Sequence, residues 1–327
     1  MRRSSTCKHL ANICAPALFR TIAIKKKPRE VVRLLDYLVN IEHFVKYLEL
    51  TLHRIPHGIL AEIVKRCSNL RCLTMHHLSG RKWYSSELLA AVVLLPALTE
   101  LRFMKYPNYP WDKTMLEPLL GSHGDKLRSL KVSGYGTLRS GGFASLIRDA
   151  SRLVELELHY VLDVGLRRSL AESSTWACAA HLQSLTFIRC GGLHANIFTH
   201  KLASGVFGHP KKVSLAMCGD ASDDKRPPGP IEWTIPALDT FKLDHFATWE
   251  MEHLQLIHAK KVFLCRVWRQ DPEGMFKMVI QQIAHKGAFP EAKEVHVTTY
   301  WSDEDLCELQ RVCSARGVKM ITRGWVD

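Results

Sequence analysis

The chain has 327 residues, of which 46% are hydrophobic and 24% charged, and its formal net charge is +13. This composition excludes a disordered chain and supplies enough apolar material for a large core. Because a single compact core stops growing at about 250–300 residues, the length favours two domains or an elongated array of repeats. The longest apolar run, residues 88–98, is too short to cross a membrane, so we expect no membrane-spanning segment.

The positive charge is concentrated at the N-terminus. Residues 1–33 contain nine Lys or Arg and one acid, Glu30, which leaves +5 for the rest of the chain. Residues 25–29, Lys-Lys-Lys-Pro-Arg, match a basic nuclear-localisation pattern, for which a solvated loop is the alternative. No basic stripe follows Arg33, so we do not expect the folded body to bind nucleic acid.

The ten cysteines indicate a reducing environment. They include no Cys-x-x-Cys pair, and most of them lie inside apolar periodic segments. Free cysteine in such a segment behaves as a small buried hydrophobe. With no secretory signal evident, we expect reduced thiols and a cytoplasmic or nuclear location.

Ten segments along the chain share the pattern apolar-x-x-apolar-x-apolar-x-x-apolar. Their second apolar positions are Leu48, Leu73, Leu101, Leu130, Leu156, Leu185, Val213, Phe241, Val262 and Val295. Seven of the nine gaps between these positions span 25–29 residues, and the last two are 21 and 33. Apolar and polar residues alternate within the segments, which predicts strands with one buried side. The regular spacing predicts about ten stacked units.

Helical periodicity appears between the strands. Apolar residues share one helical face in residues 59–67, 87–95 and 275–283. Ser302 and Asp305 resemble a capping box that begins a further helix, and Gly317 suits its end. A unit of one strand and one helix cannot bury its apolar faces alone. We therefore expect neighbouring units to stack, with their strands in one parallel sheet and the helices outside.

This repeat resembles the leucine-rich-repeat family over roughly residues 41–325. The resemblance implies an α/β solenoid, an irregular horseshoe with the parallel sheet on its concave face and the helices on its convex face. The family usually carries Asn or Cys five residues after the second apolar position, but here only Cys190 and Cys218 match. We therefore expect apolar packing to replace most of the usual hydrogen-bond ladder. Residues 219–230, rich in Pro, Gly and Asp, predict a surface-loop insertion.

A second resemblance concerns residues 7–24, which read CKHLANICAPALFRTIAI. They resemble the last helix and exit strand of the F-box in fungal F-box/leucine-rich-repeat proteins, through Cys7, Lys8, Leu10, Pro16, Leu18, Phe19 and Arg20. The resemblance implies an F-box remnant in residues 1–27 and a leucine-rich-repeat domain in residues 28–327. The Leu-Pro segment and first helices, which contact the Skp-type adaptor in that family, do not precede these residues here. We therefore expect adaptor binding only if the missing part of the F-box is restored.

No pattern indicates catalysis or metal binding. The sequence contains no G-x-S-x-G, H-E-x-x-H or G-x-x-x-x-G-K-[ST] motif. Cys190 and His194 have a Cys-x-x-x-His spacing but lack a second close pair, and a structural zinc ion needs four ligands. The acids of residues 303–305 favour a helix N-terminus through the helix dipole. We therefore expect no enzymatic activity, no cofactor and no metal.

The strand positions that alternate with the apolar ones should form the binding surface. They mix both signs of charge with polar groups, which suits recognition of a protein through charge complementarity. The candidate contact residues are Arg102, Met104, Lys131, Glu155, Glu157, His159, Thr186, Ile188, Lys242, Asp244, Phe263 and His296. We interpret the chain as a protein–protein interaction module that holds a protein substrate on the concave face.

Three hypotheses about its role remain open at this point. The first, which the F-box resemblance favours, is the substrate-recognition part of an SCF-type E3 ubiquitin ligase. The second is a leucine-rich-repeat scaffold without adaptor docking. The third, which the charge distribution favours least, is nucleic-acid binding through the basic residues 1–33.

Overall fold

A computed structural model of the chain describes residues 14–24, 31, 35–36, 38–39, 41–51, 55–77, 85–105, 113–137, 147, 150–162, 176–190, 202, 204–216, 237–244, 257–265, 277, 279–281, 283–284, 288–298 and 301–323. The chain forms two compact units, Met1–Leu153 and Val154–Asp327. Each unit is an α/β arrangement of parallel strands, which is the predicted class.

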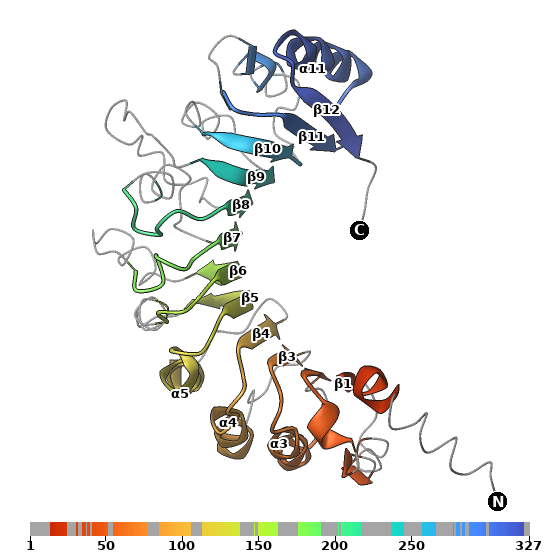
Figure 1. Cartoon of the computed structure of the whole chain (residues 1–327), viewed down its shortest axis with the longest axis vertical. Coiled ribbons are helices and arrows are strands. Elements are labelled where there is room, and N and C mark those ends of the chain that lie inside the picture. The colour runs from red at the N-terminus through yellow and green to blue at the C-terminus, as the bar shows by residue number, and fades with distance from the viewer. Residues whose placement is uncertain are drawn as a thin grey trace, which may run out of the picture. The chain divides into compact units, whose positions relative to one another are not determined.

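In the part of the first unit that the structure describes, five strands pair in chain order and run parallel (Figure 1). They are β1 (Thr21–Ile24), β2 (Tyr47–Thr51), β3 (Cys72–His77), β4 (Glu100–Lys105) and β5 (Ser129–Thr137). The connections contain the short 3-10 helix η1 (Glu42–Phe44) and the helices α3 (His57–Arg66), α4 (Ser86–Val93) and α5 (Lys113–His123). Helices α3, α4 and α5 lie side by side on one side of the strands (Figure 1).

The strand register of the first unit follows the repeat pattern. Leu48, Leu73, Leu101 and Leu130 are paired across β2–β5, and all four are buried. Burying one such leucine contributes about 1.5–3 kcal/mol. The predicted apolar helix faces are confirmed, because α3 buries Leu60, Ala61, Ile63 and Val64, and α4 buries Leu88, Ala91 and Val92.

The described residues of the second unit form seven parallel strands, also paired in chain order. They are β6 (Glu155–Leu162), β7 (Ser184–Ile188), β8 (Lys212–Ala216), β9 (Leu238–Asp244), β10 (Ala259–Leu264), β11 (Glu294–Thr298) and β12 (Lys319–Arg323). The ten strand segments predicted from the repeat are therefore confirmed as β2–β11. β1 and β12 flank them, and the repeat pattern did not include β12.

The interior of the second unit is rich in aromatic rings. Its fully buried side chains include Trp176, Phe187, Phe207, Phe241 and Phe289. The Trp176 and Phe207 rings meet edge to face, with centroids 4.8 Å apart, and the Phe187 ring lies 6.4 Å from that of Phe207. Edge-to-face contact is a favoured geometry for aromatic pairs.

Cys190 lies at the position where the leucine-rich-repeat family usually carries Asn or Cys. Its thiol is buried and lies 3.3 Å from the carbonyl oxygen of Leu158. The Cys190 thiol therefore donates a hydrogen bond to the backbone of the preceding strand, as the Asn or Cys at this position does in the leucine-rich-repeat family. Cys218, the second match, lies outside the described residues.

The last helix, α11 (Asp303–Ala315), begins and ends where the sequence predicted. The hydroxyl of Ser302 accepts the Asp305 N–H at 3.1 Å and donates to the Asp305 carboxylate at 2.6 Å. Gly317 follows the helix with a φ of +68°, a conformation that glycine adopts without strain. Of the predicted helix at 275–283, residues 277, 279–281 and 283 are described and helical.

Some predictions fall on residues that are not described. The boundary at residues 27 and 28, the insertion at 219–230 and the side chain of Asp244 are among them. In the described part of the chain, no helix has the length and apolar character needed to span a membrane.

Candidate functional site

The alternation within each strand places the predicted contact residues on the side opposite the core. In the first unit, Arg102 of β4 pairs in register with Lys131 of β5 and with Thr74 of β3. Met104 lies two residues after Arg102 on β4, on the same side. The structure therefore brings the three predicted residues of this unit onto two adjacent strands.

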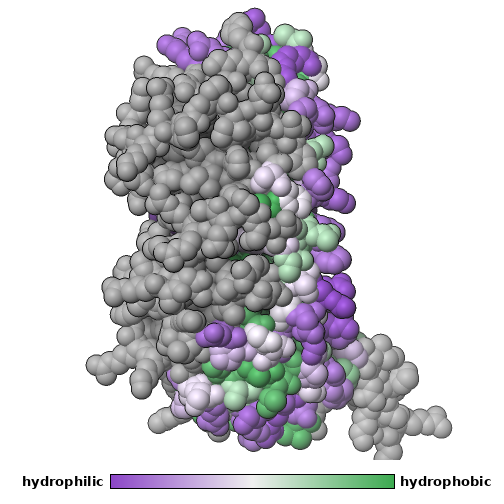
Figure 2. Space-filling model, turned by 90° about the vertical axis from the view of Figure 1, so that its left-hand side faces the viewer, coloured by the Kyte–Doolittle hydropathy of each residue, from purple (hydrophilic) through white to green (hydrophobic). Residues whose placement is uncertain are grey.

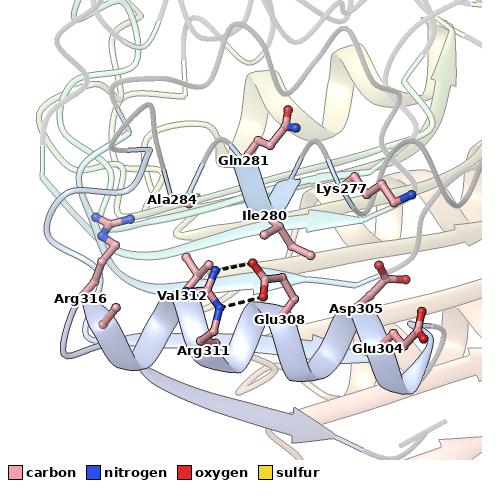
Figure 3. A pocket seen from close by; sticks show the side chains of 11 residues that line it. Lys277, Ile280, Gln281, Ala284, Glu304, Asp305, Glu308, Arg311, Val312 and Arg316 are labelled. Carbon is pink, nitrogen blue, oxygen red and sulfur yellow. Dashed lines mark hydrogen bonds and ion pairs between the residues drawn. The ribbon is translucent and has the colours of Figure 1, made fainter.

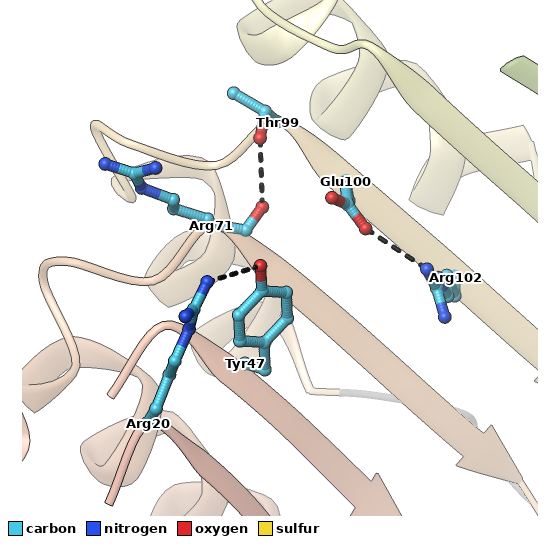
Figure 4. A network of polar contacts seen from close by, with 6 residues as sticks. All are labelled: Arg20, Tyr47, Arg71, Thr99, Glu100 and Arg102. Carbon is cyan, nitrogen blue, oxygen red and sulfur yellow. Dashed lines mark hydrogen bonds and ion pairs between the residues drawn. The ribbon is translucent and has the colours of Figure 1, made fainter. Parts of the chain in front are cut away.

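This side of the first unit contains a hollow of about 270 Å³. It is lined by Thr21, Tyr47, Leu48, Glu49, Cys72, Thr74 and Arg102. Figure 4 shows the polar contacts around it: Arg20 donates to the Tyr47 hydroxyl at 3.4 Å, and Arg102 lies 3.2 Å from the Glu100 carboxylate. The Arg20 guanidinium also lies 5.3 Å from the centre of the Tyr47 ring, within the range of a cation–π contact.

Charges in this hollow are largely compensated. Glu49 lies 3.2 Å from the imidazole of His76 on the next strand. Burial, with a smaller effect of the Glu100 charge, raises the pKa of the Cys72 thiol to about 11. Cys72 is therefore a neutral thiol near pH 7, and a neutral thiol is not a nucleophile. The hollow offers polar and aromatic contacts rather than a reactive group.

In the second unit, the predicted residues of β6 and β7 lie next to one another. Glu157 pairs in register with Thr186, and His159 with Ile188. The His159 imidazole forms an ion pair with the Glu157 carboxylate when protonated. Glu155 is exposed at the start of β6. These strands present an acidic and partly apolar surface.

The predicted residues of β9–β11 form a row across three strands. Lys242, Phe263 and His296 pair in register, and Ile321 of β12 extends the row. The Phe263 and His296 rings stack with centroids 4.2 Å apart and planes inclined by 12°. Asp244 belongs to β9, but its side chain lies outside the described part.

His296 is more buried than its outward position suggests, with only 5% of its surface exposed. Its Nε2 lies 3.0 Å from the Glu294 carboxylate, and Lys261 contacts the same carboxylate at 3.1 Å. The hydrogen bond with His296, followed by that with Lys261, lowers the pKa of Glu294. Within the described residues, the buried Nδ1 of His296 has no hydrogen-bond partner.

Sequence reasoning missed three lysines at or just before the start of strands in the second unit. Lys211, Lys260 and Lys293 are exposed, although alternation assigns them to the inward phase. Lys211 and Lys293 immediately precede β8 and β11, whereas Lys260 is the second residue of β10 and follows the buried Ala259. The paired lysines at 211–212 and 260–261 were the available signal in the sequence.

A larger hollow, of about 540 Å³, lies between α11 and the helical residues 277, 279–281, 283 and 284 (Figure 3). Its rim contains Glu308 and Arg311, whose side chains form two hydrogen bonds of 2.6 and 2.8 Å within one helical turn. Arg316 donates to the carbonyls of Ile283, Ala288 and Phe289 at 2.8–3.2 Å. These contacts attach α11 to the preceding segment, so we assign this hollow a structural role.

The helical side of the first unit also exposes some apolar surface. Figure 2 shows it at the lower end of the view, where hydrophobic and hydrophilic residues are mixed. Leu94, which follows α4, is 73% exposed. Scattered apolar residues are ordinary on protein surfaces, so this side carries no site assignment.

Among the residues that the structure describes, no group of three His, Cys, Asp or Glu side chains is placed to hold a metal ion. No protein-family model matches the chain, and no curated protein matches it in sequence.

Proposed function

We propose that this chain is a leucine-rich-repeat-type module that binds another protein through the outward side of its parallel strands. One observation carries the proposal. In both units, alternate strand residues are buried in register, and the residues between them form rows of charged, aromatic and polar side chains. Because these rows of side chains do not pack into the core, they are available to contact a partner protein.

The character of these rows favours a protein partner over a small molecule. The hollow on the outward side of the first unit is about 270 Å³, slightly below the usual range for ligand pockets. The surface instead offers Arg102, Met104 and Phe263, residue types that are enriched at protein interfaces. Charge pairs such as Glu100–Arg102 suit the setting of register and specificity.

We further propose that the module is the substrate-recognition part of an SCF-type ubiquitin ligase. The resemblance of residues 7–24 to the end of an F-box supports this role. The order of a helical turn at residues 14–18 followed by β1 agrees with it, and so do Leu18 and Phe19, which are 70% and 36% exposed. A scaffold without adaptor docking is the alternative.

The interaction role can be tested with charge reversals on the outward rows. We expect the double variant Arg102→Glu/Glu157→Lys to recover its protein partners roughly tenfold less well than the unmodified chain in quantitative affinity purification, because reversed charges repel complementary groups. The matched control is Lys65→Glu/Glu117→Lys, which reverses exposed charges on the helices. Equal loss of partners in both variants, at equal thermal stability, would contradict an outward binding surface.

The ligase role needs a separate experiment. Expressed from its native gene, the protein should co-purify with a Skp-type adaptor. Absence of the adaptor would leave the scaffold role as the better description.

A further inference from the structure

Seven lysines gather along the last five strands of the second unit. They are Lys211, Lys212, Lys242, Lys260, Lys261, Lys293 and Lys319, and we call them the lysine surface. Backbone hydrogen bonds connect the strand entrances: the Lys293 N–H donates to the Lys260 carbonyl at 2.9 Å, and the Lys319 N–H donates to the Lys293 carbonyl at 2.9 Å. The lysines therefore lie on adjacent strands, although they span more than 100 residues of sequence.

Only two of these lysines are neutralised by neighbours in the described part. Lys260 lies 2.8 Å from Asp239, and Lys261 lies 3.1 Å from Glu294. A third nearby acid, Glu291, pairs with His258 at 3.0 Å. Within the described residues, no ion pair engages the other five lysines.

An apolar strip runs through the lysine surface. In the row that begins at Lys242, the next residues are Phe263, His296 and Ile321. Phe263 and Ile321 are partly exposed, whereas His296 is 5% exposed and keeps one ring nitrogen without a partner in the described part. The strip therefore gives the lysine surface a partly apolar middle, formed by Phe263 and Ile321.

We propose that the lysine surface binds an acidic segment of a partner protein, with one apolar side chain of that segment resting on Phe263 and Ile321. The inference rests on the proposed function and names the chemistry of its partner. Carboxylates of the segment would pair with Lys212, Lys242 and Lys319, the outward lysines that have no ion pair within the described residues.

The lysine spacing suggests how the segment lies. Lys212, Lys261 and Lys319 occupy equivalent positions on alternate strands β8, β10 and β12. Neighbouring strands are about 4.8 Å apart, so successive lysines of this set are separated by about 10 Å. An extended peptide advances about 3.3 Å per residue. Acids six residues apart in an extended segment that lies across the strands would therefore match Lys212 and Lys319, and an acid midway between them would compete with Glu294 for Lys261.

The acids within the surface favour a protein over a nucleic acid. Asp239 and Glu294 lie among the lysines, and a continuous phosphate backbone would have to pass close to both of them. A peptide can place neutral residues opposite these carboxylates. The spaced acids and the apolar anchor together describe a protein segment better than a polyphosphate.

The test uses the full chain and three labelled probes in fluorescence anisotropy. The first is a 13-residue peptide with Glu at every third position and a central Phe, the second replaces this Phe with Ser, and the third is a single-stranded DNA oligonucleotide of the same charge. We expect the first peptide to bind at least about fivefold more tightly than the second, as burial of one aromatic side chain predicts. Its affinity should fall as salt rises, because salt screens exposed charges.

Two variants locate the site. The triple variant Lys212→Glu/Lys242→Glu/Lys319→Glu should weaken binding of the first peptide by about tenfold or more. The matched control Lys65→Glu/Lys126→Glu/Arg128→Glu makes the same change in charge at exposed positions of the first unit and should alter binding less than about twofold. Phe263→Ser should remove the preference for the peptide with Phe. Thermal unfolding would verify that each variant is folded.

Three results would overturn the inference: no binding of the first peptide, equal weakening in both triple variants, or tighter binding of the oligonucleotide than of the peptide. None of them bears on the Arg102→Glu/Glu157→Lys experiment, which changes other residues and uses natural partners. If the charge reversals reduce partner recovery but the peptide does not bind, the proposed interaction module stands and the acidic-segment inference is wrong. If the peptide binds but the charge reversals do not reduce partner recovery, the proposal that the outward side of both units binds the partner is wrong.

Discussion

The two units share one plan of parallel strands but fill their interiors differently. The first unit buries mainly aliphatic side chains, and Phe103 is the one ring among its largest fully buried residues in the described part. The second unit contains five such rings, including Trp176 and Phe207. The strand spacing is also less regular in the second unit, where the last two gaps are 21 and 33 residues. Large rigid rings can fill the uneven spaces that irregular connections leave.

The outward sides differ in charge. In the first unit, Glu49 and Glu100 each lie near a basic side chain of the same surface. In the second, the outward Lys212, Lys242 and Lys319 have no ion pair within the described residues. The buried rows therefore specify the fold, whereas the rows between them can differ from unit to unit. Recognition can therefore change without a change in architecture.

The largest expected effect concerns the aromatic interior of the second unit. Phe207→Ala should lower the free energy of unfolding by about 3–5 kcal/mol, because it removes a fully buried ring. A double-mutant cycle with Trp176→Leu and Phe207→Leu, measured by denaturant unfolding, should give a coupling of about 0.5–1.5 kcal/mol from the edge-to-face contact. A coupling of zero would show that the rings act only through their volume.

Buried leucines at equivalent strand positions of the two units should also contribute strongly to the free energy of unfolding. Leu130→Ala and Leu156→Ala should each cost about 2–5 kcal/mol, since both side chains are buried. Their neighbours on the outward side serve as controls: Lys131→Ala and Glu157→Ala should change stability by less than about 0.5 kcal/mol. Equal unfolding midpoints for buried and outward variants would contradict the assigned strand phase.

The smallest effect is a pH dependence in the first unit. His123, at the end of α5, is buried and donates from Nε2 to the Val92 carbonyl of α4 at 3.0 Å. Burial, the largest influence, lowers its pKa from 6.5; Lys126 lowers it further, while the Val92 hydrogen bond and Asp125 act in the opposite direction. The folded state disfavours the protonated ring. The contribution of neutral His123 to the stability of the fold is therefore fully present above pH 6.5, and it is lost as the pH falls through the lowered pKa.

We therefore expect His123→Gln, which keeps an amide donor near Val92, to flatten the decrease in the thermal midpoint between about pH 7.5 and pH 5.5. His57, whose pKa is also lowered by burial, would supply part of the remaining dependence. A variant that loses stability in acid as steeply as the unmodified chain would exclude His123 as the source.

Much of the fold was predictable because burial repeats along the sequence. Each strand segment contains two inward apolar residues, such as Leu130 and Val132, and this local signal identified ten strands and their phase. The sequence analysis did not predict strand β12, because its sequence Lys-Met-Ile-Thr-Arg buries little and lacks the repeat pattern. Packing against β11 determines it instead.

The candidate surface was only partly predictable. Alternation identified Lys242, Phe263 and His296 as outward residues, but not that the two rings stack and leave His296 nearly buried. Stacking depends on the register between strands, which a pattern within one strand does not contain. The exposed entrance lysines, such as Lys293, were missed for a related reason, since alternation ceases to hold where a strand begins.

The order of the strands has a consequence for how the chain assembles. Within each unit, every described strand after the first pairs with the one that precedes it in the sequence, as Leu48 pairs with Leu73, and Val262 with Val295. These pairings join residues about one repeat apart, a separation that is small relative to the length of the chain, and a low relative contact order favours faster folding. During synthesis, each newly made strand meets a neighbour that is already complete, so each unit can grow from its N-terminal edge while the ribosome is still translating it.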